Sequence, residues 1–201
     1  MVGLGNPGPE YRNTPHNIGF EVADRLAARW RLSKPKARYR GLITDGAASV
    51  GVDLLTGAPL SVSVALLWPQ TYMNEAGRSV GPARGALQTP PERVLVVHDE
   101  IDLPFGEIRT RLGGGLAGHN GLKSIRQALG TAEFRRVRIG VDRPASTDPE
   151  RVAAFVLGRF RQSKAEVEQL IEAAADAAER TIADAVGTAS SDERAGRATD
   201  A

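Results

Sequence analysis

Short apolar segments recur along the chain, and a glycine-rich or polar loop directly follows each of them. Residues 64–68 and 94–97 are apolar on both faces, as strands buried inside a parallel sheet are. Helical patterns lie between such segments, with residues 18, 22 and 26 on one apolar face and residues 122, 125 and 129 on another. This alternation predicts an α/β fold: a single domain with a mixed, mostly parallel twisted sheet and helices on both faces.

The length of the chain limits its organisation. With 201 residues, of which 41% are hydrophobic, it can bury one sizeable core and suits one domain better than two. Ser163-Lys164-Ala165-Glu166 is a capping box, and it begins a last helix that we expect to end at Gly187. We therefore expect a domain over residues 1–187 and a disordered C-terminal tail over residues 188–201.

Composition excludes several classes of protein. The chain has no cysteine, which excludes a disulfide framework and a thiolate metal site. No apolar run approaches the roughly 18 residues of a membrane span, and the first residues lack the basic and then apolar pattern of a secretion signal. We expect a cytoplasmic protein that has no contact with a membrane.

Charge is distributed unevenly along the chain. Residues 25–40 hold seven Lys and Arg and no acidic residue, whereas nine acidic residues outnumber four basic ones after residue 162. A basic body with an acidic C-terminal segment suggests a polyanionic partner. The alternative, that these runs are ordinary solvated faces, is about equally consistent with the pattern.

Residues 2–20 hold the most distinctive loop, because glycines and prolines cluster there after a short apolar strand. Thr14 and Pro15 are typical of the N-cap and the first position of a helix. His16 then lies in the first helical turn, where the helix N-terminus disfavours its protonated form and keeps it available as a proton acceptor. Taken alone, the loop is equally consistent with a simple turn of the chain and with a functional site.

Other motifs compete for these residues. Gly3, Gly5 and Gly8 match the glycine spacing of a dinucleotide fingerprint, but no acidic residue ends a second strand about 20 residues later, as that fold requires. A serine hydrolase lacks its G-x-S-x-G elbow. A metal site is a further alternative, but no two of its candidate histidines have the i, i+4 spacing of ligands on one helix. Its candidate ligands are His16, His98, His119, Asp99, Glu100 and Asp102.

Asn6, Asn74 and Asp99 follow predicted strands, and Asn120 is the expected N-cap of the helix that carries residues 122, 125 and 129. Because ligands of α/β sheets bind at the carboxyl ends of strands, we expect these side chains to converge. Asp99 can then accept a hydrogen bond from His16, so that the other ring nitrogen takes a proton from water. The asparagines can hold an amide-rich ligand and a tetrahedral oxyanion. This chemistry predicts hydrolysis of an ester or amide without a protein nucleophile.

A known family shares these motifs in the same order. The chain closely resembles bacterial-type peptidyl-tRNA hydrolase over roughly residues 2–185, through the segments GLGNPGPEY, TPHNIGF, PQTYMNEAG, VVHDEIDLPFG, GGGLAGHNGLKS, FRRVRIGVDRP and FVLGRF. The resemblance implies a monomeric cytoplasmic enzyme that acts on peptidyl-tRNA, without a cofactor, a metal or an obligatory protein partner. It would cleave the ester between the peptide and the 3′ ribose. The alternative is a non-catalytic RNA-binding relative of the same fold.

The resemblance also implies roles for individual residues. His16 matches the catalytic base and Asp99 the carboxylate that orients it. The residues that match the substrate site are Asn6, Tyr11, Tyr72, Met73, Asn74 and Asn120. Those that match the grip on the tRNA 5′ phosphate are Arg111 and Arg138, with Arg109 beside them.

Four positions depart from the family pattern. Pro15 stands where the family usually has arginine before the catalytic histidine. Leu116 and Ala117 replace the more usual His-Gly or Gly-Gly, and Asp142 replaces a glycine. None of these changes removes a matched catalytic residue.

Overall fold

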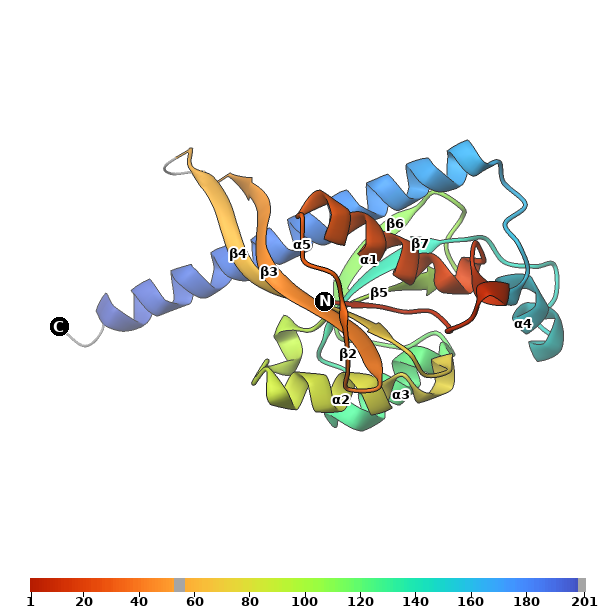
Figure 1. Cartoon of the computed structure of the whole chain (residues 1–201), viewed down its shortest axis with the longest axis horizontal. Coiled ribbons are helices and arrows are strands. Elements are labelled where there is room, and N and C mark those ends of the chain that lie inside the picture. Colours follow the sequence, from red (N-terminus) through yellow and green to blue (C-terminus); the bar gives the residue numbers. More distant parts are fainter. Residues whose placement is uncertain (53–56, 199–201) are drawn as a thin grey trace.

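The structure is a computed structural model that describes residues 1–52 and 57–198, with side chains through residue 186. A seven-stranded sheet in the order β2-β3-β4-β1-β5-β7-β6 forms its centre (Figure 1). The four central strands β4, β1, β5 and β7 pair in parallel, and β2, β3 and β6 add antiparallel pairs at the edges. The strands are β1 (Val2–Gly3), β2 (Lys36–Arg38), β3 (Gly41–Val52), β4 (Pro59–Pro69), β5 (Leu95–Glu100), β6 (Ile108–Leu112) and β7 (Arg135–Gly140).

Helices cover both faces of this sheet, as the sequence predicts. α1 and α5 pack with the apolar cluster on one face, and α2 and α3 pack with the second cluster on the other (Figure 1). The helices are α1 (Ile18–Arg29), α2 (Gly77–Ala86), α3 (Asn120–Leu129), α4 (Pro149–Leu157) and α5 (Lys164–Ala198). Short 3-10 turns precede several of them: η1 (Pro9–Tyr11), η2 (Pro15–Asn17), η3 (Met73–Glu75) and η4 (Pro91–Arg93).

Two glycines set the position of α1 against the sheet. A Cβ atom on Gly3 of β1 would collide with the carbonyl oxygen of Gly19 in α1, and one on Gly19 would collide with the backbone of Val97 in β5. Only glycine permits such a close approach of helix and strand. The start of α1, and η2 just before it, therefore lie directly over the carboxyl end of β5.

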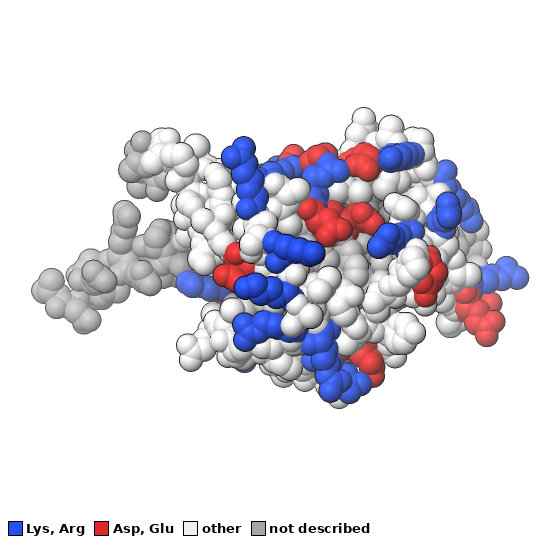
Figure 2. Space-filling model, in the orientation of Figure 1, with Lys and Arg blue, Asp and Glu red and all other residues white. Residues whose placement is uncertain are grey.

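The basic and acidic segments of the chain meet in α1 and α5. Arg25 is paired with Glu168 and Glu172, and Arg29 reaches Glu172 as well as Asp176 and Glu179. Figure 2 shows blue and red side chains interspersed over the upper part of the molecule, where these helices lie. Much of the acidic charge of α5 is thus used within the chain.

The start of α5 is confirmed and its end is corrected. The Ser163 backbone N–H donates to Glu166 Oε2 at 2.8 Å, and the Glu166 N–H donates to Ser163 Oγ at 3.3 Å, which is the predicted capping box. The helix continues beyond Gly187 to Ala198, because a glycine inside a helix costs only about 1 kcal/mol. Side chains from residue 187 onward lie outside the described part, so the expected disordered tail over residues 188–201 stays a prediction.

Candidate active site

His16 and Asp99 form the centre of the site. Asp99 lies in β5 with only 3% of its side chain exposed, and its Oδ1 is 2.9 Å from Nδ1 of His16. A carboxylate accepts, so Nδ1 of His16 carries the hydrogen and Nε2 keeps its lone pair. This is the contact that the sequence predicts, and it gives the neutral imidazole one free basic nitrogen.

The backbone around His16 differs in detail from the expectation. Thr14 is the N-cap and Pro15 the first residue, but of the 3-10 turn η2, and α1 begins only at Ile18. The Thr14 hydroxyl does not cap that turn, since it donates to the carbonyl oxygen of Tyr11 at 2.7 Å. His16 therefore lies before the α-helix, away from the position where the helix N-terminus acts most strongly.

The sequence predicts that the neutral form of His16 is favoured, and the structure corrects this expectation. Burial lowers the pKa of His16, but the charge of Asp99 and the hydrogen bond to it raise the pKa, and the net shift is upward. A base with a pKa above its usual value accepts protons more strongly from water. Asp99 itself has a pKa well below its usual range: burial opposes its ionisation, and the charges and hydrogen bonds of His16 and His119 overcome that effect.

His119 also contacts Asp99, although the sequence placed it only in the rival metal site. Its Nε2 lies 3.1 Å from the same Asp99 oxygen that contacts His16. Its Nδ1 accepts the backbone N–H groups of Gly121 and Leu122, so His119, and not Asn120 as predicted, is the N-cap of α3. The available signal was the only other histidine in a glycine-rich loop, between Gly118 and Asn120.

The expected convergence of asparagines is present in two groups. Asn6 is buried, and its Oδ1 accepts the Met73 N–H at 2.7 Å, which joins the first loop to η3. Asn6 also exchanges hydrogen bonds with the side chain of Asn17. Asn74 and Asn120 are exposed and line one surface pocket of about 400 Å³ with residues of α3.

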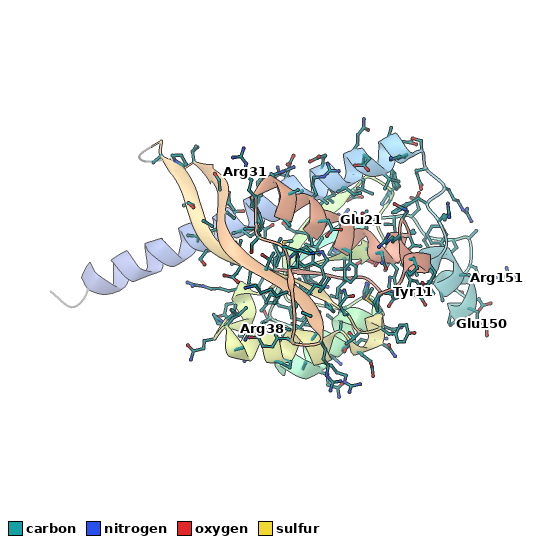
Figure 3. The ribbon with its side chains drawn as sticks, viewed as in Figure 1. Tyr11, Glu21, Arg31, Arg38, Glu150 and Arg151 are labelled. Atoms are coloured by element: carbon teal, nitrogen blue, oxygen red, sulfur yellow. The ribbon has the colours of Figure 1, made fainter. Side chains whose placement is uncertain are left out.

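The other expected substrate residues have different environments. Met73 is 5% exposed, and its sulfur occupies the space that a Cβ atom on Gly121 would need. Tyr72 is 62% exposed. Tyr11 is half-buried at the end of η1, and Figure 3 shows it at the end of the molecule where α4 carries Glu150 and Arg151.

Arginines gather where β6 pairs with β7. Arg109 lies opposite Arg138, and Arg111 lies opposite Arg136. Arg136 is 1% exposed and donates to the carbonyl oxygens of Gly113 and Gly115, so it holds the glycine-rich loop. These side chains share one face, because cross-strand partners point the same way.

The three arginines expected at a phosphate are engaged to different degrees. Arg138 is 19% exposed and paired with the buried carboxylate of Glu100 at 3.1 Å. Arg109 is exposed and paired with Glu107. Arg111 is exposed, and its guanidinium lies against the backbone of Gly114. Of these three described arginines, Arg111 is the one that is not in an ion pair.

The proposed metal ligands are only partly brought together. Ligand atoms of His16, Asp99 and His119 lie within 4.8 Å of one another. Both imidazole N–H groups already donate to the carboxylate, and Nδ1 of His119 is used by the start of α3. Among the described residues this cluster is therefore arranged for proton chemistry, and Asp102 is instead paired with Arg143.

Comparison with known proteins gives one consistent family. The family model described as peptidyl-tRNA hydrolase matches residues 1–199. The peptidyl-tRNA hydrolase of Mycolicibacterium smegmatis is 49% identical over 185 residues, which is 91% of this chain and 90% of that protein. The corresponding protein of Mycobacterium tuberculosis is 47% identical over 184 residues, with 90% of each chain covered.

A solved structure shows the same fold. The crystal structure of peptidyl-tRNA hydrolase from Acinetobacter baumannii superposes with a TM-score of 0.75 at 36% identity, covering 94% of this chain and 90% of that one. Fold, motif order and sequence identity all agree over nearly the whole chain. The chain therefore belongs to the peptidyl-tRNA hydrolase family.

Proposed function

We propose that the protein hydrolyses the ester bond between the peptide and the 3′-terminal ribose of peptidyl-tRNA, with His16 as the general base. The observation that carries this proposal is the 2.9 Å contact between His16 Nδ1 and the buried Asp99 carboxylate. It leaves Nε2 of His16 as the acceptor for a water proton. Family membership supports the substrate, and the dyad supports the chemistry.

The reaction then proceeds in two proton transfers. His16 takes a proton from water as the water oxygen attacks the ester carbonyl carbon, and the imidazolium that forms is stabilised by Asp99. When the tetrahedral intermediate collapses, the C–O bond to the ribose breaks. His16 returns its proton to the 3′ oxygen, so free tRNA and the free peptide acid leave an unchanged enzyme.

The asparagine amides are the groups that bind the substrate. Asn6 directs its oxygen at Met73, which leaves its amide nitrogen as the group that donates to a ligand. Asn74 and Asn120 face solvent in a shared pocket, which suits them to hold peptide carbonyls; their match to the family also implies a part in placing the attacking water. Tyr72 and Met73 line the peptide site beside them, and Tyr11 lies at the tRNA end.

The β6–β7 face binds the tRNA phosphate. Arg guanidinium groups suit phosphate oxygens, and Arg111 is exposed there beside Arg109. Arg138 contributes from the neighbouring strand, while its pairing with Glu100 holds its orientation. Arg111→Ala should weaken tRNA binding and reduce its salt dependence, whereas Arg31→Ala, outside this face, should have a smaller effect. An unchanged salt slope for Arg111→Ala would remove it from the phosphate site.

The central test uses purified protein and an N-acetylated aminoacyl-tRNA. Wild-type protein should release the acylated amino acid, and His16→Ala should abolish release while tRNA binding and the thermal midpoint stay close to wild type. An alanine variant as active as wild type would show that His16 is not the base. Tight tRNA binding by wild type without hydrolysis would favour the non-catalytic RNA-binding alternative.

The enzyme is further proposed to act as a cytoplasmic monomer without an obligatory protein partner. The proposed dyad and amide groups all come from one chain, so the site is complete without a second copy. Within the described residues no helix has both the length and the apolar character needed to cross a membrane. Light scattering of the active protein at assay concentration would test this, and a dimer mass would contradict it.

A further inference from the structure

All three histidines of the chain lie around Asp99. The ring centroid of His119 is 5.1 Å from that of His16 and 5.0 Å from that of His98. Only His16 has a role in the proposed reaction. His119 lies between the other two, and its side chain is 8% exposed.

The hydrogen bonds of His119 fix its tautomer. The N–H groups of Gly121 and Leu122 donate to Nδ1 at 3.1 and 3.4 Å, and an N–H group can donate only to an unprotonated nitrogen. The ring hydrogen of neutral His119 must therefore sit on Nε2. This nitrogen faces Asp99 Oδ1 at 3.1 Å, so it donates to the carboxylate.

The charged and titratable groups that surround His119 come from two elements. Asp99 and His98 face it from β5, and His16 faces it from η2. His98 donates from Nδ1 to the Asp99 carbonyl oxygen at 2.6 Å, and burial lowers its pKa well below the usual value, so it stays neutral. Asp99 is thus the anion nearest to His119, and its Oδ1 accepts two N–H groups at once.

We propose that His119 is a positioning residue of the active site, whose Nε2–H holds the Asp99 carboxylate and limits how strongly that carboxylate attracts the proton of His16. The proposal rests on the proposed function of His16 as the base. A donor on a carboxylate stabilises its charge, and the stabilised anion gains less from a neighbouring imidazolium. Without this donor, His16 would hold its proton to a higher pH.

Two substitutions separate this role from the capping of α3. The amide oxygen of asparagine can take the place of Nδ1, so His119→Asn keeps an N-cap but loses the donor to Asp99. The longer glutamine side chain can place an amide N–H near Nε2, so His119→Gln keeps the donor but loses the cap. A purely structural role of His119 would be disturbed by glutamine and spared by asparagine.

The expected result is a shift in the titration of His16. NMR of the histidine ring protons should give a His16 pKa about one pH unit higher in His119→Asn than in wild type, and nearly unchanged in His119→Gln. The acid limb of kcat/KM for N-acetylated aminoacyl-tRNA should move by the same amount. Equal shifts in both variants, or no shift in His119→Asn, would overturn the proposal.

A measurement on the wild-type protein tests the tautomer without any variant. At a pH above the pKa of His16, nitrogen-15 spectra of labelled histidine should show neutral His119 protonated at Nε2 and neutral His16 at Nδ1, and a neutral His119 with its hydrogen on Nδ1 would overturn the proposal. The NMR titration also distinguishes the two hypotheses. If the His16 pKa moves in His119→Asn while the acid limb stays in place, His119 tunes His16 but His16 is not the base.

Discussion

Replacement of Asp99 by asparagine removes the charge on which the proposed base depends. The Asp99 oxygen is 2.9 Å from His16 Nδ1, which puts the charge centres of carboxylate and imidazolium about 4 Å apart. At the effective dielectric constant of about 20 that suits such sites, their attraction is about 4 kcal/mol. Asparagine can still accept a hydrogen bond, so a loss of about 3 kcal/mol remains, and kcat/KM should fall roughly 100-fold to 1,000-fold.

The assay follows release of the acylated amino acid from tRNA as a function of pH. Asp99 raises the pKa of His16, so in Asp99→Asn the acid limb should move to lower pH while the plateau falls. Asp102→Asn is the matched control, because Asp102 lies three residues further on and is exposed in a pair with Arg143. A plateau within about threefold of wild type in a folded Asp99→Asn protein would refute the electrostatic role.

Three further changes test the rest of the structure. Burial holds the pKa of His98 far below that of the unfolded chain, so its contribution to stability is present above about pH 6.5 and lost as pH falls. The free energy of unfolding should drop by up to about 1.4 kcal/mol from pH 6 to pH 5 in urea titrations, and His98→Leu should flatten this slope. Ser163→Ala should lower that free energy by about 1 kcal/mol through loss of the cap, with Ser61→Ala as an exposed control. Arg29→Met should lower it by roughly 1 kcal/mol at low salt and by less at about 1 M salt, whereas Arg31→Met should change it little.

Local signals in the sequence predicted the parts of the fold that depend on few residues. The capping box at Ser163 and Glu166 formed as expected, because both partners lie within one helical turn. The approach of the Asp99 carboxylate to His16 was predictable as well, because parallel strands bring their carboxyl ends, and the loops that follow them, to one edge of the sheet.

The cap of α3 shows where local rules fail. Asparagine is a strongly preferred N-cap, so Asn120 was the better choice from sequence alone. In the structure Asn120 is the first helical residue, and His119 caps the helix with Nδ1 while Nε2 reaches Asp99 in another element. A long-range partner therefore decides which of two adjacent residues is the cap, and no local pattern contains that partner.

Charge segregation along the chain was equally ambiguous. A basic segment and an acidic segment predicted a polyanionic partner, but Arg25 and Arg29 are paired with the acidic side chains of α5. The arginines that we propose to bind the tRNA phosphate lie instead on β6 and β7, where Arg111 is exposed. Helix packing decides which basic residues pair with acidic residues of the same chain. The distribution of charge along the sequence does not contain that information.

Two departures from the family pattern also have a physical reading. Asp142 and Ala117 both have positive φ, at 67° and 47°, a backbone region that glycine enters without strain. Asp142 is among the residues that tolerate this region, and its Oδ1 accepts the N–H of Phe105 at 2.8 Å, which offsets part of the cost. Ala117 has no comparable side-chain contact, so Ala117→Gly is the more stabilising of the two glycine substitutions.

The dyad also limits which bond of the substrate can be cleaved. A tetrahedral intermediate expels its better leaving group, and an alkoxide from ribose leaves far more readily than an amide nitrogen, which must first be protonated. Asp99 raises the pKa of His16, the proposed base, and within the described part of the chain the side-chain hydrogen bond of His16 goes to Asp99 and not to a serine that it could activate as a nucleophile. Because a peptide bond also requires protonation of its leaving nitrogen, we expect the ester to react faster and the peptide released from tRNA to remain intact.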